Sequence, residues 1–195
     1  SLMREKIFNK DLIIEHAMHM FWTKGYHQTS IQDLVKIVGF NRAGLYDAFG
    51  DKETLFKSCF MKYREEVLLQ FNDLFNQQNT SREAFESFFE FITNAYFNDP
   101  QRKGCLICNT YVEFLPTDDT EIKNLLSDTR EMITDILYNK LKQASVNNEL
   151  NKEINHRNIS NTIYSSMVGV AVLSKTNIEK KDTTGLFFTY LNIFK

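Results

Sequence analysis

The side chains best suited to chemistry in this sequence are hydrogen-bond donors in its first third. Arg42 carries a planar guanidinium that can donate two hydrogen bonds to O6 and N7 of guanine. Tyr46 offers a hydroxyl and Lys52 an ammonium, and both groups suit phosphate oxygens. Ala43 and Gly44 are small enough to let the backbone come close to a ligand. These residues predict contacts with DNA if one exposed helix presents them.

Two short helices joined by a tight turn must position these side chains. Ser30 and Asp33 form a capping-box-like start, and apolar residues then recur at helical spacing as far as Val38. Gly39 suits the left-handed end of that helix and Asn41 can cap the next, so the turn has only about three or four residues. This length is typical of a DNA-binding helix-turn-helix, although an ordinary helical hairpin also fits the spacing.

The second helix, over residues 42–49, is expected to show one face to the protein and one to solvent. The residues at its inward-facing positions are apolar: Leu45, Ala48 and Phe49. Its outward spacing carries Arg42, Ala43, Tyr46 and Asp47. Gly50 then breaks the helix, and Asp51 caps a third helix whose first residue is Lys52, where free backbone N–H groups can receive a phosphate.

Three signatures lie within about residues 10–60. They read A-x-x-x-F-x-x-K-G-Y from Ala17, T-S-I-x-D-L from Thr29, and V-G-F-N-R-x-x-L-Y-x-x-F-x-D-K-E-x-L-F from Val38. Together they closely resemble the DNA-binding domain of the TetR family of transcriptional regulators. The resemblance implies that the operator backbone is held by Thr29, Asn41, Tyr46 and Lys52, and that bases are read by Arg42 and Ala43. We add Ser30 and Gly44, at the two helix starts, to the candidate DNA-binding residues. Asp47 departs from the neutral residue usual in the family.

Composition agrees with a helical regulator. The chain has 195 residues, of which 43% are hydrophobic and 17 are Phe, so a sizeable core is expected. Only two Pro and seven Gly interrupt it. Residues 1–64 carry 10 Lys or Arg against 7 Asp or Glu, a balance of +3, whereas the remainder carries 13 against 18, a balance of −5. The basic part therefore coincides with the predicted DNA-binding segment. No apolar run is long enough to span a membrane, and three cysteines suit a reducing compartment, so a cytoplasmic protein without membrane partners is expected.

The sequence predicts an all-α fold in two domains. Residues 1–50 form a three-helix DNA-binding domain with the helix-turn-helix, and residues 51–195 form a helical ligand-binding and dimerisation domain. The expected helices cover residues 10–24, 31–38, 42–49, 51–78, 81–97, 104–114, 117–145, 155–175 and 182–194. The fourth helix is long enough to connect the domains mechanically, the fifth is apolar almost all round and should be central, and Trp22 should pack between the domains.

The last two helices are too apolar for one partner helix to cover them. We therefore expect a homodimer whose interface contains Ile163, Tyr164, Val168, Val172, Phe187, Leu191 and Phe194. This is also how the family that the sequence resembles forms its four-helix interface. Burial of both helices in one large monomeric core is the alternative.

Large rings on the fourth and fifth helices face small or polar groups on the sixth, which predicts an effector pocket. Its expected lining is Phe60, Tyr63, Phe88, Phe91, Cys105, Cys108, Asn109 and Tyr111. A small apolar or aromatic effector fits, because the fifth and sixth helices offer no inward Lys or Arg; a solidly packed core is the alternative. Cys105 and Cys108 have the spacing of a metal or redox pair, but no second pair or nearby His supports a metal, and a thiol switch stays open.

The functional hypothesis is a repressor that binds a palindromic operator as a homodimer and is released by a small molecule. The sequence contains no G-x-S-x-G, Walker loop or H-E-x-x-H, so an enzyme is not expected, and no cofactor or metal is predicted. A helical small-molecule-binding protein or enzyme with a vestigial DNA-binding domain is the alternative.

Overall fold

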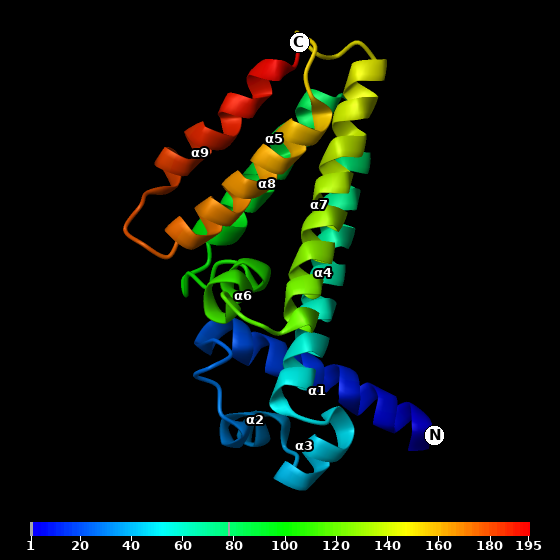
Figure 1. Cartoon of the computed structure of the whole chain (residues 1–195), viewed down its shortest axis with the longest axis vertical. Helices are drawn as coiled ribbons and strands as arrows, with labels where there is room; N and C mark the ends of the chain where they lie inside the picture. Colours follow the sequence, from blue (N-terminus) through cyan, green and yellow to red (C-terminus); the bar gives the residue numbers. More distant parts are fainter. Residues whose placement is uncertain (1, 78) are drawn as a thin grey trace.

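The computed structural model describes the backbone of residues 2–77 and 79–195, and within these ranges the side chains from residue 10 onward. Nine α-helices and one 3-10 helix are found in these ranges, with no strand, so the predicted all-α fold is confirmed. None of the described helices is both long and apolar enough to cross a membrane. Figure 1 shows an elongated molecule with three helices gathered at one end and the C-terminus at the other.

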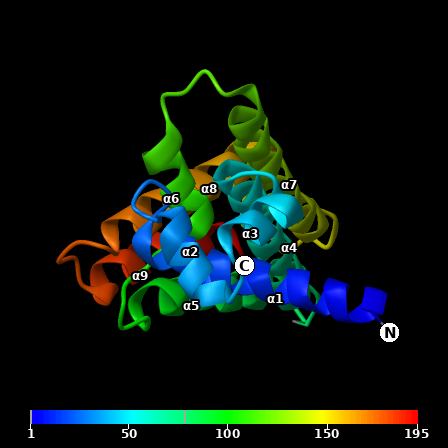
Figure 2. The same cartoon turned by 90° about the horizontal axis from the view of Figure 1, so that it is seen from below.

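We call the first three helices the head and the remaining helices the body. The head contains α1 (Leu2–Lys24), α2 (Ile31–Val38) and α3 (Arg42–Phe49). The body contains α4 (Lys52–Asn76), α5 (Ser81–Phe97), α6 (Leu106–Phe114), α7 (Thr120–Val146), α8 (His156–Leu173), α9 (Lys180–Thr189) and the 3-10 helix Tyr190–Ile193. The short helix α6 lies where head and body meet (Figure 1), and the view from below shows the head helices in front of the body (Figure 2).

Most helix bounds lie within three residues of those expected from the sequence, and the larger differences are at α1 and at the last helix. Helix α1 begins at Leu2, well before the expected residue 10. Helix α4 ends at Asn76, and residue 78, its expected end, lies outside the described residues. The last expected helix divides into α9 and a 3-10 helix, because the chain tightens from Tyr190 to bring Phe194 beside Leu150 in an isolated bridge.

Local hydrogen bonds explain where the body helices start. Thr80 and Glu83 form a capping box at α5, in which Glu83 N donates to Thr80 Oγ1 at 3.2 Å and Thr80 N donates to Glu83 Oε2 at 3.1 Å. Asp119 Oδ1 accepts from Glu121 N at 2.9 Å and from Ile122 N at 3.1 Å, which fixes the start of α7. These caps satisfy N–H groups that a helix start leaves without partners.

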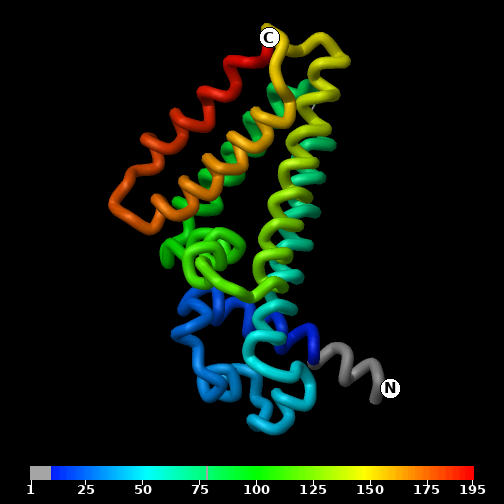
Figure 3. Tube along the Cα trace, in the orientation of Figure 1, coloured from blue at the N-terminus to red at the C-terminus, as the bar shows by residue number. Residues whose placement is uncertain are grey.

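Helix α5 is central, as predicted. Phe85, Phe88 and Phe89 on this helix are fully buried. The Phe88 ring centroid lies 4.9 Å from that of Phe71 and 5.0 Å from that of Phe75, both on α4. Helix α9 also packs against α5. The C-terminal segment, drawn in red in Figure 3, runs along the body to the end far from the head. Aromatic contacts of this kind stabilise the core beyond simple burial.

Candidate DNA-binding surface and effector pocket

The turn between α2 and α3 is fixed by the residues that the sequence indicated. Asp33 N donates to Ser30 Oγ at 3.0 Å, and Ser30 N donates back to Asp33 Oδ2 at 2.9 Å. Gly39 ends α2 with a φ of 69°, which favours glycine, and Gly44 N donates to Asn41 Oδ1 at 2.7 Å. A hydrogen bond from Lys24 Nζ to Asp33, at 2.6 Å, holds the pKa of that carboxyl well below its usual range. The helix pair thus starts, turns and starts again at defined residues.

One face of α3 is open to solvent and polar. Asn41, Arg42, Ala43, Tyr46 and Asp47 are exposed, whereas Leu45 is buried against the rest of the head. The Arg42 guanidinium lies 5.7 Å from the Tyr46 ring centroid, so the two donors share one patch. This arrangement has the form of a recognition helix, whose N-terminal residues meet base edges in the major groove. The contacts of individual residues with DNA stay predictions.

Two candidate DNA-binding residues lie differently from the rest. Thr29 is fully buried, its hydroxyl donates to Gly25 O at 2.6 Å, and its backbone N–H donates to Tyr26 O at 3.2 Å. The polar groups of Thr29 therefore form hydrogen bonds within the loop before α2. The prediction that its side chain binds a phosphate directly is corrected. Lys52 is half-buried, with its ammonium 4.2 Å from the Tyr26 ring centroid, and burial lowers the pKa of Lys52. Its charge is held at the edge of the head by a cation–π contact.

The C-terminal end of helix α6 contacts the head. Tyr26 N and His27 N donate to the two carboxylate oxygens of Glu113 at 3.0 and 3.2 Å. Phe114 stacks beside Phe56, with 5.0 Å between ring centroids. Because Gly25 has a φ of 90°, the loop can pass close to this carboxylate. The sequence did not indicate this contact, since Glu113 is 87 residues from Tyr26.

A second contact between head and body is made by Trp22. Its indole N–H donates to Gly104 O at 3.1 Å, and its ring meets the edge of Tyr63 at 5.0 Å between centroids. The predicted packing of Trp22 between head and body is therefore confirmed.

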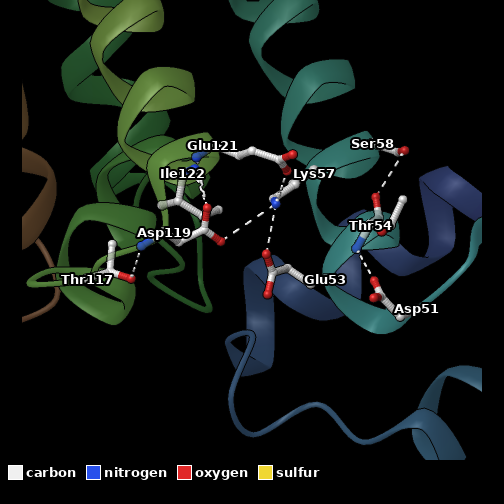
Figure 4. Close-up of polar contacts among 9 residues, drawn as sticks. All are labelled: Asp51, Glu53, Thr54, Lys57, Ser58, Thr117, Asp119, Glu121 and Ile122. Atoms are coloured by element: carbon white, nitrogen blue, oxygen red, sulfur yellow. Dashed lines mark hydrogen bonds and ion pairs between the residues drawn. The ribbon is translucent and has the colours of Figure 1, made fainter.

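An ion-pair cluster joins the start of α4 to the start of α7. Lys57 Nζ lies 2.8 Å from Glu53 Oε1 and 3.7 Å from Asp119 Oδ2, and it also contacts the carboxylate of Glu121. Figure 4 shows the ammonium between the three carboxylates. Since Asp119 caps α7, the cluster ties the first turns of these two helices together.

A cavity of about 380 Å³ lies in the body, enclosed mainly by α4, α5, α6 and α8. Its volume is within the range of small-molecule sites. Most of the lining is apolar, and no Lys or Arg belongs to it; the lining residues include Trp22, Tyr63, Phe71, Phe91, Ile92, Tyr96, Cys105, Ile107, Cys108, Ile133, Tyr164, Met167 and Val168. Glu66, Gln70 and Ala95 also line it and are exposed, so the cavity meets solvent between α4 and α5.

Four of the eight expected pocket residues line this cavity: Tyr63, Phe91, Cys105 and Cys108. The expected places of the other four are corrected. Phe60 and Phe88 are fully buried in the core. The Asn109 side chain donates to Lys103 O at 3.0 Å and contacts the Lys175 ammonium, while the Tyr111 hydroxyl is 3.0 Å from that of Tyr164.

The predicted dimer residues divide into three groups. Ile163, Phe187, Leu191 and Phe194 are buried within the subunit, and Tyr164 and Val168 line the cavity. Val172, with 40% of its surface exposed, is the most open of the seven to a second subunit. The five buried residues Ile163, Tyr164, Phe187, Leu191 and Phe194 are corrected, because other helices of the same chain cover them, whereas Val168 is partly exposed and also lines the cavity. Tyr96, Tyr164 and Met167 also line the cavity and were not predicted to do so. Their helical spacing can be read from the sequence, but the sequence does not show that this face of each helix borders the cavity.

The capped turn, the exposed face of α3 and the helical body define a helix-turn-helix transcriptional regulator. Residues 13–59 match the sequence profile described as "Bacterial regulatory proteins, tetR family". The chain is 32% identical over 151 residues to the HTH-type transcriptional regulator YezE of Bacillus subtilis, a match that covers 77% of each chain. It belongs to the TetR family, as the resemblance of its N-terminal segment implied, and the family consists of DNA-binding regulators, not enzymes.

Other relatives agree. The HTH-type transcriptional repressor ComR of Escherichia coli is 29% identical over 148 residues, which cover 75% of this chain and 70% of ComR. Among solved structures, the TetR family regulator CifR, a cysteine mutant complexed with 26-bp double-strand operator DNA, has the same fold. Its TM-score is 0.81 at 19% identity, over 95% of this chain and 96% of that one.

Proposed function

We propose that this regulator is a repressor that binds a palindromic operator as a homodimer and leaves it when a small molecule occupies the body cavity. Residues 1–50 would bind DNA, and residues 51–195 would bind the effector and the second subunit. The observation that carries the proposal is the position of α6. Its first turn lines the cavity through Cys105 and Cys108, and its last turn holds the head through Glu113.

The physical argument follows from the length of α6. This helix has nine residues and is rigid over that distance, so a ligand that displaces its first turn also moves Glu113. Glu113 in turn holds the backbone immediately before α2. A palindromic site requires the two recognition helices to be about 34 to 36 Å apart, so a small shift of each head weakens both halves of the complex. The ligand then acts by favouring the displaced arrangement over the DNA-binding one.

An exposed strip along α8 and α9 is the proposed contact surface for the second subunit. On α8, Ser165, Gly169 and Val172 are exposed at helical spacing, and on α9, Gly185 and Leu186 are exposed. A Cβ atom at either glycine would meet nothing within 4 Å, so another helix can approach these backbones closely. Small residues beside exposed Val and Leu suit packing between helices. Val172 is thus the one member of the interface predicted from the sequence that we retain.

Selection from random DNA, followed by binding assays on the selected site, tests DNA recognition. Arg42→Ala should cost about 1–3 kcal/mol and relax the preference at one base pair of each half-site. Lys52→Ala should weaken binding to all sequences and flatten its salt dependence. Lys142→Ala removes an exposed charge from the body and serves as the control. If no sequence is enriched, the repressor proposal is wrong; if Arg42→Ala leaves affinity and site unchanged, α3 is not the recognition helix.

Light scattering tests the dimer. The unmodified chain should scatter as a dimer at micromolar concentration, and charges introduced by Val172→Glu together with Leu186→Glu should dissociate it. Val146→Glu introduces the same charge at an exposed position at the end of α7 and should leave the dimer intact. A monomeric unmodified chain would contradict the interface and the palindromic site with it.

A further inference from the structure

Two of the three cysteines face the cavity, and the proposed regulator does not by itself require them. Cys105 is the N-cap residue of α6 and Cys108 lies in its first turn; they are 8% and 5% exposed, and both line the cavity. Cys59 differs, because it is fully buried on α4, outside the cavity lining, with its thiol 3.5 Å from Ile14 O. The wall of the cavity therefore contains two neighbouring thiols.

The start of α6 stabilises a negative charge on Cys105. A helix N-terminus leaves backbone N–H groups without partners, and it carries partial positive charge. The adjacent Cys108 thiol, together with the backbone N–H groups of Cys108 and Ile107, lowers the pKa of Cys105 to about 7. The adjacent Cys105 thiol raises the pKa of Cys108, and burial raises that of Cys59. Cys105 is thus the thiol that ionises first, and a thiolate is the reactive form.

Tyrosine hydroxyls adjoin this sulfur. Tyr63 from α4 and Tyr96 from α5 are 9% and 5% exposed and line the cavity, and the Tyr63 hydroxyl is next to the Cys105 thiol. Among the described side chains and backbone the Tyr96 hydroxyl has no hydrogen-bond partner, and Tyr96 lines the cavity, so a ligand there can reach it. An oxygen acceptor on a ligand would satisfy it. The remaining wall is apolar, so the ligand must combine a carbonyl-like oxygen with a small apolar frame.

We propose that Cys105 is a covalent-modification site for small α,β-unsaturated carbonyl compounds that enter this cavity, with Tyr96 donating a hydrogen bond to their carbonyl oxygen. The Cys105 thiolate, whose proton has passed to solvent, forms a bond from sulfur to the β-carbon. The π electrons of the C=C bond move toward the carbonyl oxygen, and the resulting enolate takes a proton from water at its α-carbon. The product is a thioether, and nothing is oxidised or reduced.

The site has an entrance and a mechanical connection. Glu66 and Gln70 lie at the exposed edge of the cavity, so a small molecule can reach the thiols between α4 and α5. An adduct on Cys105 adds atoms at the first turn of α6, whose last turn holds the head through Glu113. This consequence for DNA binding rests on the proposed function, whereas the modification itself does not.

The direct test treats the unmodified full-length protein with methyl vinyl ketone at pH 7. Intact-mass spectrometry should show one addition, and peptide mapping should place it on Cys105. Cys105→Ser should abolish this addition, and Cys59→Ser is the matched control that should retain it. Tyr96→Phe should lower the rate of addition about tenfold. This is less than the loss of rate when an enzyme loses one hydrogen-bond donor to an oxyanion. Mapping on the unmodified protein identifies the site even if a variant fails to fold, and addition only at Cys59 or Cys108 would overturn the proposal.

The rate should also depend on pH with a midpoint near 7, below the value of about 8.5 for a free thiol. The titratable groups near Cys105 are Tyr63 on α4, Tyr96 on α5, Cys108 and Tyr111 on α6, Tyr164 on α8 and Lys175 after α8, and Glu66 on α4 also lines the cavity. Burial raises the pKa of each of these four tyrosines and lowers that of Lys175, so the tyrosines stay neutral through the midpoint. A midpoint near that of a free thiol would contradict the role of the helix start.

Operator binding separates this inference from the proposed function. If the adduct forms on Cys105 and the selected DNA site is released, both are supported. If the adduct forms and DNA stays bound, the modification site is supported and release through α6 is contradicted. If no adduct forms on a chain that binds its DNA site, the modification site is overturned while the DNA-binding function stands.

Discussion

Replacement of Glu113 by Ala should loosen the head without unfolding the body. In the native chain the Glu113 carboxylate accepts hydrogen bonds from Tyr26 N at 3.0 Å and His27 N at 3.2 Å. The truncation removes both acceptors and leaves two N–H groups at the edge of the head to water. Because Glu113 is on the short helix α6, which also lines the cavity, this contact is where the body meets the loop before α2.

The magnitude follows from the type of contact. A hydrogen bond to a charged group contributes about 1.5–3 kcal/mol when it is well buried. Glu113 is partly exposed, so solvent screening reduces the two bonds to a combined contribution of about 1–2 kcal/mol. If the loop opens independently, this loss corresponds to about 5- to 30-fold faster opening. Glu113→Gln keeps one oxygen acceptor and should lie between Glu113→Ala and the native chain.

Hydrogen–deuterium exchange measures this opening residue by residue. The amides of Tyr26 and His27 should exchange about 5- to 30-fold faster in Glu113→Ala, while amides inside α5 keep their protection. Val112→Ala changes a neighbouring side chain that is exposed, and it should leave both amides unchanged. Unaltered exchange at Tyr26 and His27 in Glu113→Ala would refute the idea that this carboxylate holds the head.

Two further substitutions test the framework. Gly25→Ala should lower the free energy of unfolding by about 1–2 kcal/mol, because φ is 90° and a Cβ there would lie 3.0 Å from Glu113 Oε1; an unchanged urea midpoint would contradict this. Phe88→Ala should cost about 3–5 kcal/mol, since it opens a hole among packed rings, and Phe91→Ala should cost less because Phe91 already borders the cavity. Equal urea midpoints for these two variants would contradict the presence of free space beside Phe91.

The DNA-binding end could be predicted because its signals are local. Ser30 caps α2, Gly39 ends it and Asn41 caps α3 through contacts that span three or four residues, so neighbours in sequence decide them. The exposed face of α3 follows from the helical period in the same way. Thr29 is the exception, because its hydroxyl turned inward to Gly25 O and took it out of reach of a ligand.

The pocket could be predicted only in part, because each wall comes from a different helix. The ring-rich faces of α4 and α5 gave Tyr63 and Phe91, but Phe60 and Phe88 on the same helices are covered by core neighbours. Sequence spacing says which side chains share a face. It does not say which distant helix covers that face or where the packing leaves space.

The sequence by itself determined the family, the helical class, the turn of the DNA-binding head and the central place of α5, since caps, glycines and apolar periods act within one or two turns. The tertiary structure decided how α8 is used: Tyr164 and Val168 line the cavity, Ile163 is buried, and Val172 stays exposed. A helix that is apolar on several sides carries no local signal for choosing between them. The choice depends on helices that fold against it from elsewhere in the chain, as does the grip of Glu113 on a loop 87 residues away.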